Sequence, residues 1–220
     1  MARPRRLSRD ESRAETRQRL LDAARETFAQ KGFHGASVEE IAERAGFSRG
    51  AFYSNFEDKD ELFLALLDER DQRQYDEVGE LLRVTPASDF LEALRARVQH
   101  RSDRRAWFML SLEFVLYAMR NVEVMPKLAA RQQSEIDAYT FAVMAQHEAL
   151  GIALPAPAEQ LGTIVRALER GFLMQEYVAP ASAPGQEFID ALVLLLRASA
   201  ALAEQAQGPE VSPGKPDRPS

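Results

Sequence analysis

The sequence predicts an all-α protein of about nine helices, in which a three-helix N-terminal domain with a helix-turn-helix precedes a larger helical bundle. Apolar residues recur every three or four positions through most of the chain, which is the spacing of a helix face. The alternating runs of β-branched residues that mark strands are missing from it. Proline stands at or near the start of several periodic segments, where its missing N–H costs a helix little.

The first helix is expected over residues 12–31. Leu20, Ala24 and Phe28 fall on one of its faces at helical spacing. Gly32 follows at the position after the helix end. Glycine is common there because it adopts a left-handed backbone conformation without a steric penalty.

A short second helix is expected over residues 38–45. Ser37 precedes it, and Glu40 stands three positions after this serine, which is the arrangement of a capping box. Ile41 and Ala42 lie on its apolar face, which can pack on the first helix.

The third helix is expected over residues 48–54, after a tight turn at Gly46, where the backbone needs a positive φ. Phe47, Phe52 and Phe56 are expected to anchor this helix in the core. Its exposed side is left with small and polar residues, namely Ser48, Arg49, Gly50, Tyr53 and Asn55.

Longer helices make up the rest of the chain. Asp58, with Glu61 at the third helical position, caps a helix that is expected to reach about residue 82. Further helices are expected over residues 88–101, 103–120, 126–150, 157–178 and 186–205. The predicted domains are a flexible basic arm at residues 1–11, the helix-turn-helix domain at 12–57, the bundle at 58–206 and a disordered tail at 207–220.

Composition excludes several kinds of chemistry. The chain has no cysteine, so disulfides, thiolate metal sites and cysteine nucleophiles are excluded. Its three histidines are far apart, and no glycine-rich phosphate loop is present. We therefore expect no enzymatic activity, no catalytic residue, no cofactor and no metal. No apolar run is long enough to cross a membrane, so we expect no membrane partner and a cytoplasmic location.

Charge is distributed unevenly along the chain. The net charge is −6, but residues 1–57 hold 11 Lys or Arg and 9 Asp or Glu, which leaves the remainder at −8. The N-terminal arm alone carries Arg3, Arg5, Arg6 and Arg9. This pattern fits a domain that binds nucleic acid, joined to an acidic second domain, although a solvated tail would have the same composition.

The exposed residues of the two short helices have the chemistry of DNA contacts. The guanidinium of Arg49 can bind guanine O6 and N7 as a fork, or it can bind a phosphate. Gly50 would let the backbone approach DNA closely, and hydroxyl, amide and ammonium groups can reach phosphate oxygens. The predicted contact set is Ser37, Ser48, Arg49, Gly50, Tyr53, Asn55 and Lys59.

This segment resembles the TetR family of transcriptional regulators. The match includes Gly32-Phe33, Ala36-Ser37-Val38, Ile41-Ala42, Ala45-Gly46-Phe47-Ser48, Gly50-Ala51-Phe52-Tyr53, Phe56, Lys59 and Leu62-Phe63. The family often has His or Tyr at the position of Asn55, which puts that phosphate contact in doubt. The resemblance implies a homodimer on double-stranded DNA. It also implies a repressor that a small-molecule ligand releases from a palindromic operator.

The bundle contains candidates for a ligand pocket. The expected ligand is an apolar or aromatic small molecule, and Glu113 and Arg166 are notable because a buried charge needs either a ligand or each other as partner. The candidate pocket residues are Trp107, Phe108, Glu113, Phe114, Tyr117, Phe141, Met144, Arg166 and Phe172. Aromatic and methionine residues at this spacing are also typical of a plain core.

The last two helices carry broad apolar stripes that must be buried. The resemblance implies that they pair with their twofold copies. The predicted dimer residues are Leu161, Val165, Leu168, Phe188, Leu192, Leu195, Leu196, Ser199 and Leu202. A core formed within one chain is the alternative for these stripes. For the whole protein, the alternative is a DNA-binding dimer that is regulated by a protein partner without a small molecule.

Overall fold

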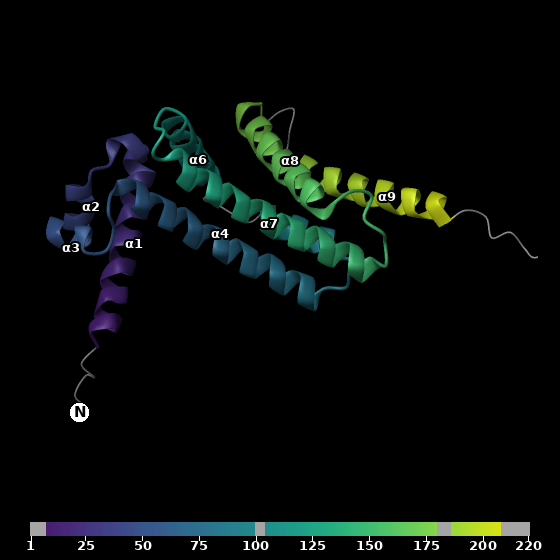
Figure 1. Ribbon diagram of the computed structural model, residues 1–220, viewed down its shortest axis with the longest axis horizontal. Coiled ribbons are helices and arrows are strands. Elements are labelled where there is room, and N and C mark those ends of the chain that lie inside the picture. Colours follow the sequence, from purple (N-terminus) through teal and green to yellow (C-terminus); the bar gives the residue numbers. More distant parts are fainter. Residues whose placement is uncertain (1–7, 100–103, 180–185, 208–220) are drawn as a thin grey trace, which may run out of the picture. The chain divides into compact units, whose positions relative to one another are not determined.

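The computed structural model describes residues 8–99, 104–179 and 186–207, and these ranges contain nine helices and no strand (Figure 1). The helices are α1 (Arg9–Gly35), α2 (Val38–Arg44), α3 (Arg49–Tyr53), α4 (Lys59–Val84), α5 (Phe90–Gln99), α6 (Arg104–Ala118), α7 (Met125–Leu150), α8 (Ala158–Val178) and α9 (Glu187–Gln207). The all-α prediction is confirmed. Of the tail predicted at 207–220, residue 207 ends α9 and the rest lies outside the described residues, as does most of the basic arm, with Arg3, Arg5 and Arg6.

The first helix begins earlier than the sequence pattern predicts. Ser8 is its N-cap, and the Ser8 hydroxyl accepts a hydrogen bond from the Glu11 N–H at 3.1 Å. The Glu11 carboxylate accepts in return from the Ser8 N–H at 2.7 Å, which completes a capping box. The prediction of a flexible arm up to residue 11 is therefore wrong for residues 9–11, where this capping signal outweighs the weak apolar pattern.

The predicted capping box at α2 is only half formed. The Ser37 hydroxyl accepts from the Glu40 N–H at 3.2 Å, as expected. The Glu40 carboxylate instead pairs with Lys31 Nζ on α1 at 2.7 Å. A charged partner from another helix thus replaces the local hydrogen bond.

The contacts between Cα atoms divide the chain into two compact units. The described residues of Met1–Val78 and His100–Glu135 form the first unit, and those of Gly79–Gln99 and Ile136–Ser220 form the second. Both α4 and α7 have residues in each unit. The predicted domain boundary at residue 58 lies inside the first unit.

Aromatic rings from α1, α4 and α6 form the centre of the first unit's core. Phe33, Phe63 and Phe114 are fully buried, and their ring centroids lie 4.8–5.1 Å apart. Such edge-to-face and offset pairs stabilise a core beyond the area they bury. Phe114, a predicted pocket residue, therefore belongs to this core. Among the described residues, no helix has the length and apolar character that crossing a membrane requires.

The second unit has its own smaller core, formed largely by α8 and α9. Val165, Phe188 and Ile189 are buried together, and Leu168, Phe172, Leu192 and Leu195 pack against them. Leu161 and Ser199 are also buried, and the Ser199 hydroxyl donates to the Leu195 carbonyl in the preceding turn. Most of the predicted dimer residues thus pack within the chain, whereas Leu202 is exposed.

Candidate nucleic-acid interface

The helix-turn-helix is held on α1 by the apolar residues that the sequence singles out. Ile41, Ala42, Phe52 and Phe56 are buried in the same core as the apolar face of α1. Gly46 has a φ of +78°, which confirms the expected left-handed turn between α2 and α3. Figure 1 shows these two short helices beside α1.

Three arginines of α1 fix the turn and the end of α3, and the sequence analysis misses them. Arg19 donates to the Ala45 carbonyl at 2.8 Å, Arg13 to the Ser54 carbonyl at 3.2 Å, and Arg17 to the Asn55 carbonyl at 2.9 Å. Cations are favourable at helix C-termini, where carbonyl groups point outward without helical partners. The four-residue spacing of Arg13 and Arg17 is a signal that could have found them.

The exposed side of α3 carries an arginine with two partners. Arg49 Nη1 lies 2.9 Å from Glu39 Oε1 on α2, and Arg49 Nη2 donates to the Tyr53 hydroxyl at 3.4 Å. The hydrogen bond to Tyr53 and the charge of Glu39 raise the pKa of Arg49, so its guanidinium stays charged. Arg49 and Tyr53 therefore share one exposed face, as predicted. The pairing of Arg49 with Glu39 was not predicted from the sequence.

Gly50 occupies a helical position where the fold leaves room for a side chain. A Cβ at this position would have only the Ser48 hydroxyl near it, at an ordinary contact distance of 3.7 Å. Its φ is not in the left-handed region. Glycine costs a helix up to about 1 kcal/mol relative to alanine. Nothing within the described chain requires this glycine.

The two serines of the predicted contact set are both N-caps. The hydroxyl oxygens of Ser37 and Ser48 accept from the N–H groups of Glu40 and Ala51, respectively. Each hydroxyl keeps its own hydrogen as a donor. Both serines are exposed, so that donor can reach an acceptor outside the chain.

Asn55 and Lys59 make internal contacts. The Asn55 amide donates to the Ala51 carbonyl at 2.8 Å. Lys59 Nζ donates to the carbonyls of Phe33 and Ala36 at 2.8 and 3.0 Å and lies 4.5 Å from the Phe33 ring centroid. Burial lowers the pKa of Lys59, and the neighbouring Asp60 opposes this shift. Because an ammonium has three N–H groups, one remains for a further acceptor.

Glu113 has a structural partner, contrary to the prediction that it faces a ligand or Arg166. Its Oε2 accepts from the Phe33 N–H at 2.8 Å. The same carboxylate fills the space beside Gly32, which has a φ of +71°. Glu113 on α6 therefore holds the junction between α1 and α2.

The candidate pocket residues are divided between the two units. Trp107, Phe108, Glu113, Phe114 and Tyr117 belong to the first unit, where Trp107 and Phe108 are buried and the Tyr117 hydroxyl donates to Asp60 at 3.0 Å. Arg166 and Phe172 belong to the second unit and are half-buried. Phe141 and Met144 are exposed on α7, which contradicts their assignment to an enclosed pocket. Helical spacing placed these two residues on an apolar stripe without showing whether it is covered.

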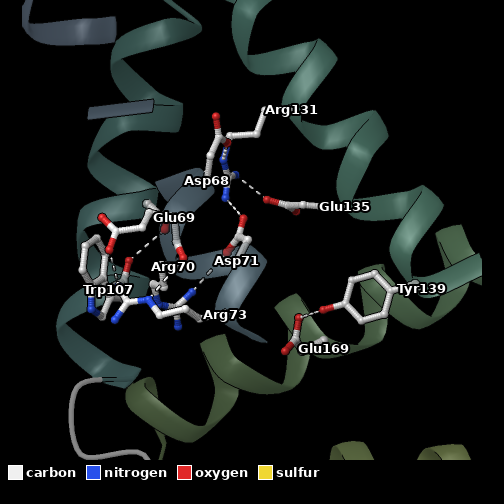
Figure 2. A network of polar contacts seen from close by, with 11 residues as sticks. Asp68, Glu69, Arg70, Asp71, Arg73, Trp107, Arg131, Glu135, Tyr139 and Glu169 are labelled. Atoms are coloured by element: carbon white, nitrogen blue, oxygen red, sulfur yellow. Dashed lines mark hydrogen bonds and ion pairs between the residues drawn. The ribbon is translucent and has the colours of Figure 1, made fainter. Parts of the chain in front are cut away.

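A polar hollow of about 420 Å³ lies between α4 and α7 within the first unit. Arg131 lines this hollow. Figure 2 shows Arg131 paired with Asp68, Asp71 and Glu135. Asp71 and Glu135 are largely buried, and burial raises the pKa of Asp68. The sequence analysis assigned no role to this cluster, because its members are ordinary charged residues spaced along two helices.

The packing of α2 and α3 on α1, together with the exposed polar side of α3, defines a helix-turn-helix protein. Residues 20–66 match the family model described as bacterial regulatory proteins, tetR family. The helix-turn-helix segment of the chain thus matches the TetR family, as its sequence suggested.

Curated relatives match the N-terminal part of the chain. It is 42% identical over 94 residues to the HTH-type transcriptional activator FasR of Mycolicibacterium smegmatis, covering 43% of this chain and 40% of that protein. It is 37% identical over 97 residues to the HTH-type transcriptional repressor AcnR of Corynebacterium diphtheriae, covering 44% of this chain and 47% of the relative. The matches thus span less than half the length of either relative.

Solved structures share the fold over most of the chain. A TetR-family regulator described as putative, from Rhodococcus sp., has a TM-score of 0.69 at 22% identity and covers 83% of this chain and 98% of its own. Salmonella enterica GusR has a TM-score of 0.63 at 24% identity, with 90% and 100% covered. A regulator from Saccharomonospora viridis, solved in complex with choline, has a TM-score of 0.63 at 19% identity, with 84% and 96% covered.

Proposed function

We propose that this chain is a transcriptional regulator that reads double-stranded DNA through α3. The observation that carries the proposal is Gly50, an exposed helical glycine that the fold does not need, directly beside the exposed Arg49. A glycine that weakens its own helix is explained if a partner must approach the backbone closely at this point. The major groove admits a helix in this way.

The proposed contacts divide into base reading and positioning. Arg49 is proposed to contact a base edge, because its fork of N–H groups matches guanine. Tyr53, Ser37 and Ser48 are proposed to donate hydroxyl hydrogens to phosphates. Lys59 has one N–H left for the same purpose, whereas the Asn55 amide is already bonded to its own helix.

We also propose that the chain acts as a homodimer, through faces of α8 and α9 other than those that form the second unit's core. Large apolar side chains are exposed on both helices, namely Ile164, Met174, Val178, Leu194 and Leu202. Exposed apolar residues gathered on neighbouring helices are typical of a protein interface. A twofold dimer would present two copies of α3 to successive major grooves of a palindromic site in the cytoplasm.

A small molecule that binds to the helical bundle is the proposed effector. The Saccharomonospora viridis neighbour holds choline, which supports a small-molecule site in this fold. An apolar or aromatic compound stays the proposed ligand, although Phe141 and Met144 are exposed and do not line an enclosed pocket. Such a ligand must prefer the form that has left DNA, because equal affinity for both forms shifts nothing. Whether bound protein represses or activates depends on where its site lies relative to a promoter.

Selection from a pool of random duplexes tests the DNA-binding proposal. The full chain should enrich duplexes with two symmetric half-sites roughly one helical turn apart. Arg49→Ala should then relax the preference at one base pair and weaken binding by about 1–3 kcal/mol. Equal weakening on every duplex would instead make Arg49 a phosphate contact, and failure to enrich any sequence would contradict the proposal.

Gly50→Ala separates the needs of the fold from those of DNA. The substitution should raise the free energy of unfolding by up to about 1 kcal/mol, because alanine favours the helix, and it should still weaken binding to the selected duplex. Gly79→Ala on α4 is the matched control, since a Cβ there meets nothing within 4 Å and one at Gly50 makes only an ordinary contact of 3.7 Å. The control should leave DNA binding unchanged. Unchanged binding in Gly50→Ala would contradict the proposed close approach of DNA to the backbone at this position.

A further inference from the structure

An ion pair joins α2 to α3 across the surface proposed to meet DNA. Arg49 Nη1 lies 2.9 Å from Glu39 Oε1, and the two side chains remain 63% and 59% exposed. Glu39 and Tyr53 are the groups that act on the Arg49 charge. Glu43, four residues further along α2, is also exposed and is not among the groups that act on Arg49.

This pair adds little to the stability of the fold. Exposed ion pairs gain little in water, because solvent screens the charges and two long side chains must be immobilised. Its effect lies in where the guanidinium is held. The charge of Glu39 pairs with Nη1 and the Tyr53 hydroxyl accepts a hydrogen bond from Nη2, so both ends of the fork have a partner before DNA arrives. Fixing a flexible side chain in advance reduces the entropy lost on binding.

The carboxylate also has an electrostatic effect on DNA. Glu39 places a full negative charge beside the cation that would otherwise attract any phosphate. On an unrelated sequence, where Arg49 finds no suitable base, this charge opposes binding because most of that binding is electrostatic. On a matching site, the Arg49 N–H groups not used by Glu39 and Tyr53 can bind guanine, and that contact offsets the repulsion.

We propose that Glu39 is a specificity-determining residue, which holds Arg49 for base reading and opposes its use on phosphates. The inference rests on the proposed DNA-binding function and adds a residue that makes unrelated DNA a poorer ligand. Specificity is a difference between two affinities, so a repulsive group can raise it without strengthening the correct complex.

Glu39→Gln in the full chain tests this role. Binding is measured by fluorescence anisotropy, over a range of salt concentrations, on the duplex selected by the wild-type chain and on a scrambled duplex of the same composition. We expect affinity for the scrambled duplex to rise more than affinity for the selected one, so that their ratio falls roughly five- to tenfold. Glu43→Gln, which removes the same charge from the same helix, should change both affinities by the same factor and leave the ratio unchanged.

A background without Arg49 decides whether Glu39 acts through that arginine. In Arg49→Ala, the further change Glu39→Gln should alter the ratio no more than Glu43→Gln does. A full effect in this background would show that Glu39 contacts DNA by itself and would overturn the positioning role. Equal ratios for Glu39→Gln and Glu43→Gln would make Glu39 an ordinary surface charge. A wild-type chain that selects no sequence would contradict the proposed function itself, before any variant is compared.

Discussion

Both polar groups of the Phe33 backbone are bound by charged side chains from other helices. Glu113 on α6 accepts from its N–H at 2.8 Å, and Lys59 on α4 donates to its carbonyl at 2.8 Å. The backbone here lies near the end of α1, directly after the kink at Gly32. These two contacts therefore determine where α2 begins and, through it, where Ser37 lies.

Lys59→Met tests how much this junction contributes to stability. Methionine keeps much of the apolar contact but cannot donate to the carbonyls of Phe33 and Ala36. Hydrogen bonds that involve a charged group contribute roughly 1.5–3 kcal/mol, so we expect a loss of about 2 kcal/mol in the free energy of unfolding, measured with urea. Lys127→Met is the control, because the ion pair that Lys127 forms with Glu57 is long, at 4.0 Å. Equal stability of the two variants would show that the junction does not depend on Lys59.

Local signals predicted the backbone of the candidate site, but they did not predict its polar partners. Gly46 was identified because a positive φ is a property of one residue and its neighbours. The partner of Phe33 is 80 residues away at Glu113, and no spacing rule links the two. Arg49 was found on its exposed face, whereas its partner Glu39 depends on how two helices pack.

At the scale of elements, periodicity placed the helices well because each helix is set by its own apolar pattern and ends. It did not show which partner covers each face. Val165 and Phe188 lie on stripes that predicted a dimer contact, and they pack together within one chain. An apolar stripe requires burial, but the same stripe serves equally well within a chain and between two chains.

The crossing of α7 and α8 depends on one glycine. A Cβ at Gly162 would lie 2.2 Å from the Thr140 hydroxyl oxygen and 2.8 Å from the Thr140 backbone nitrogen. The hydroxyl could rotate away, but the backbone nitrogen cannot move without shifting α7. The two helices of the second unit can therefore approach this closely only if residue 162 has no side chain.

Gly162→Ala should destabilise the protein although alanine is the better helix former. Overpacking costs typically 1–3 kcal/mol and the gain in helix propensity is about 1 kcal/mol, so we expect a net loss of up to about 2 kcal/mol in urea unfolding. Gly171→Ala on the same helix is the control, since a Cβ there meets nothing within 4 Å, and it should raise stability. A gain in stability from both substitutions would mean that α8 does not press on Thr140.

At the scale of the whole molecule, both units expose large apolar side chains, Met119 and Val122 in the first unit among them, and the first unit also presents a polar face. The first unit presents Arg49 and Tyr53 at its surface, which suits a polyanion. The second unit exposes large aliphatic side chains on α8 and α9 although it already has a core. These exposed residues increase the apolar surface in water without adding to that core, and the proposed homodimer would cover them with a second copy of the chain.

The double substitution Leu194→Glu and Leu202→Glu should convert the proposed dimer to a monomer. Both leucines are more than half exposed, at 66% and 53%, so the changes should leave the fold of each chain intact. Each leucine buried at an interface contributes about 1.5–3 kcal/mol, and twofold symmetry repeats every change in both protomers. Sedimentation should give the wild-type chain near twice 24.7 kDa and the variant near that mass itself. Val122→Glu, an exposed apolar position in the first unit, should remain dimeric.

Because two copies of α3 must bind together on a symmetric duplex, the monomeric variant should also lose most of its affinity for that duplex while keeping its affinity for a single half-site. A variant that still sediments as a dimer would place the interface away from this face of α9.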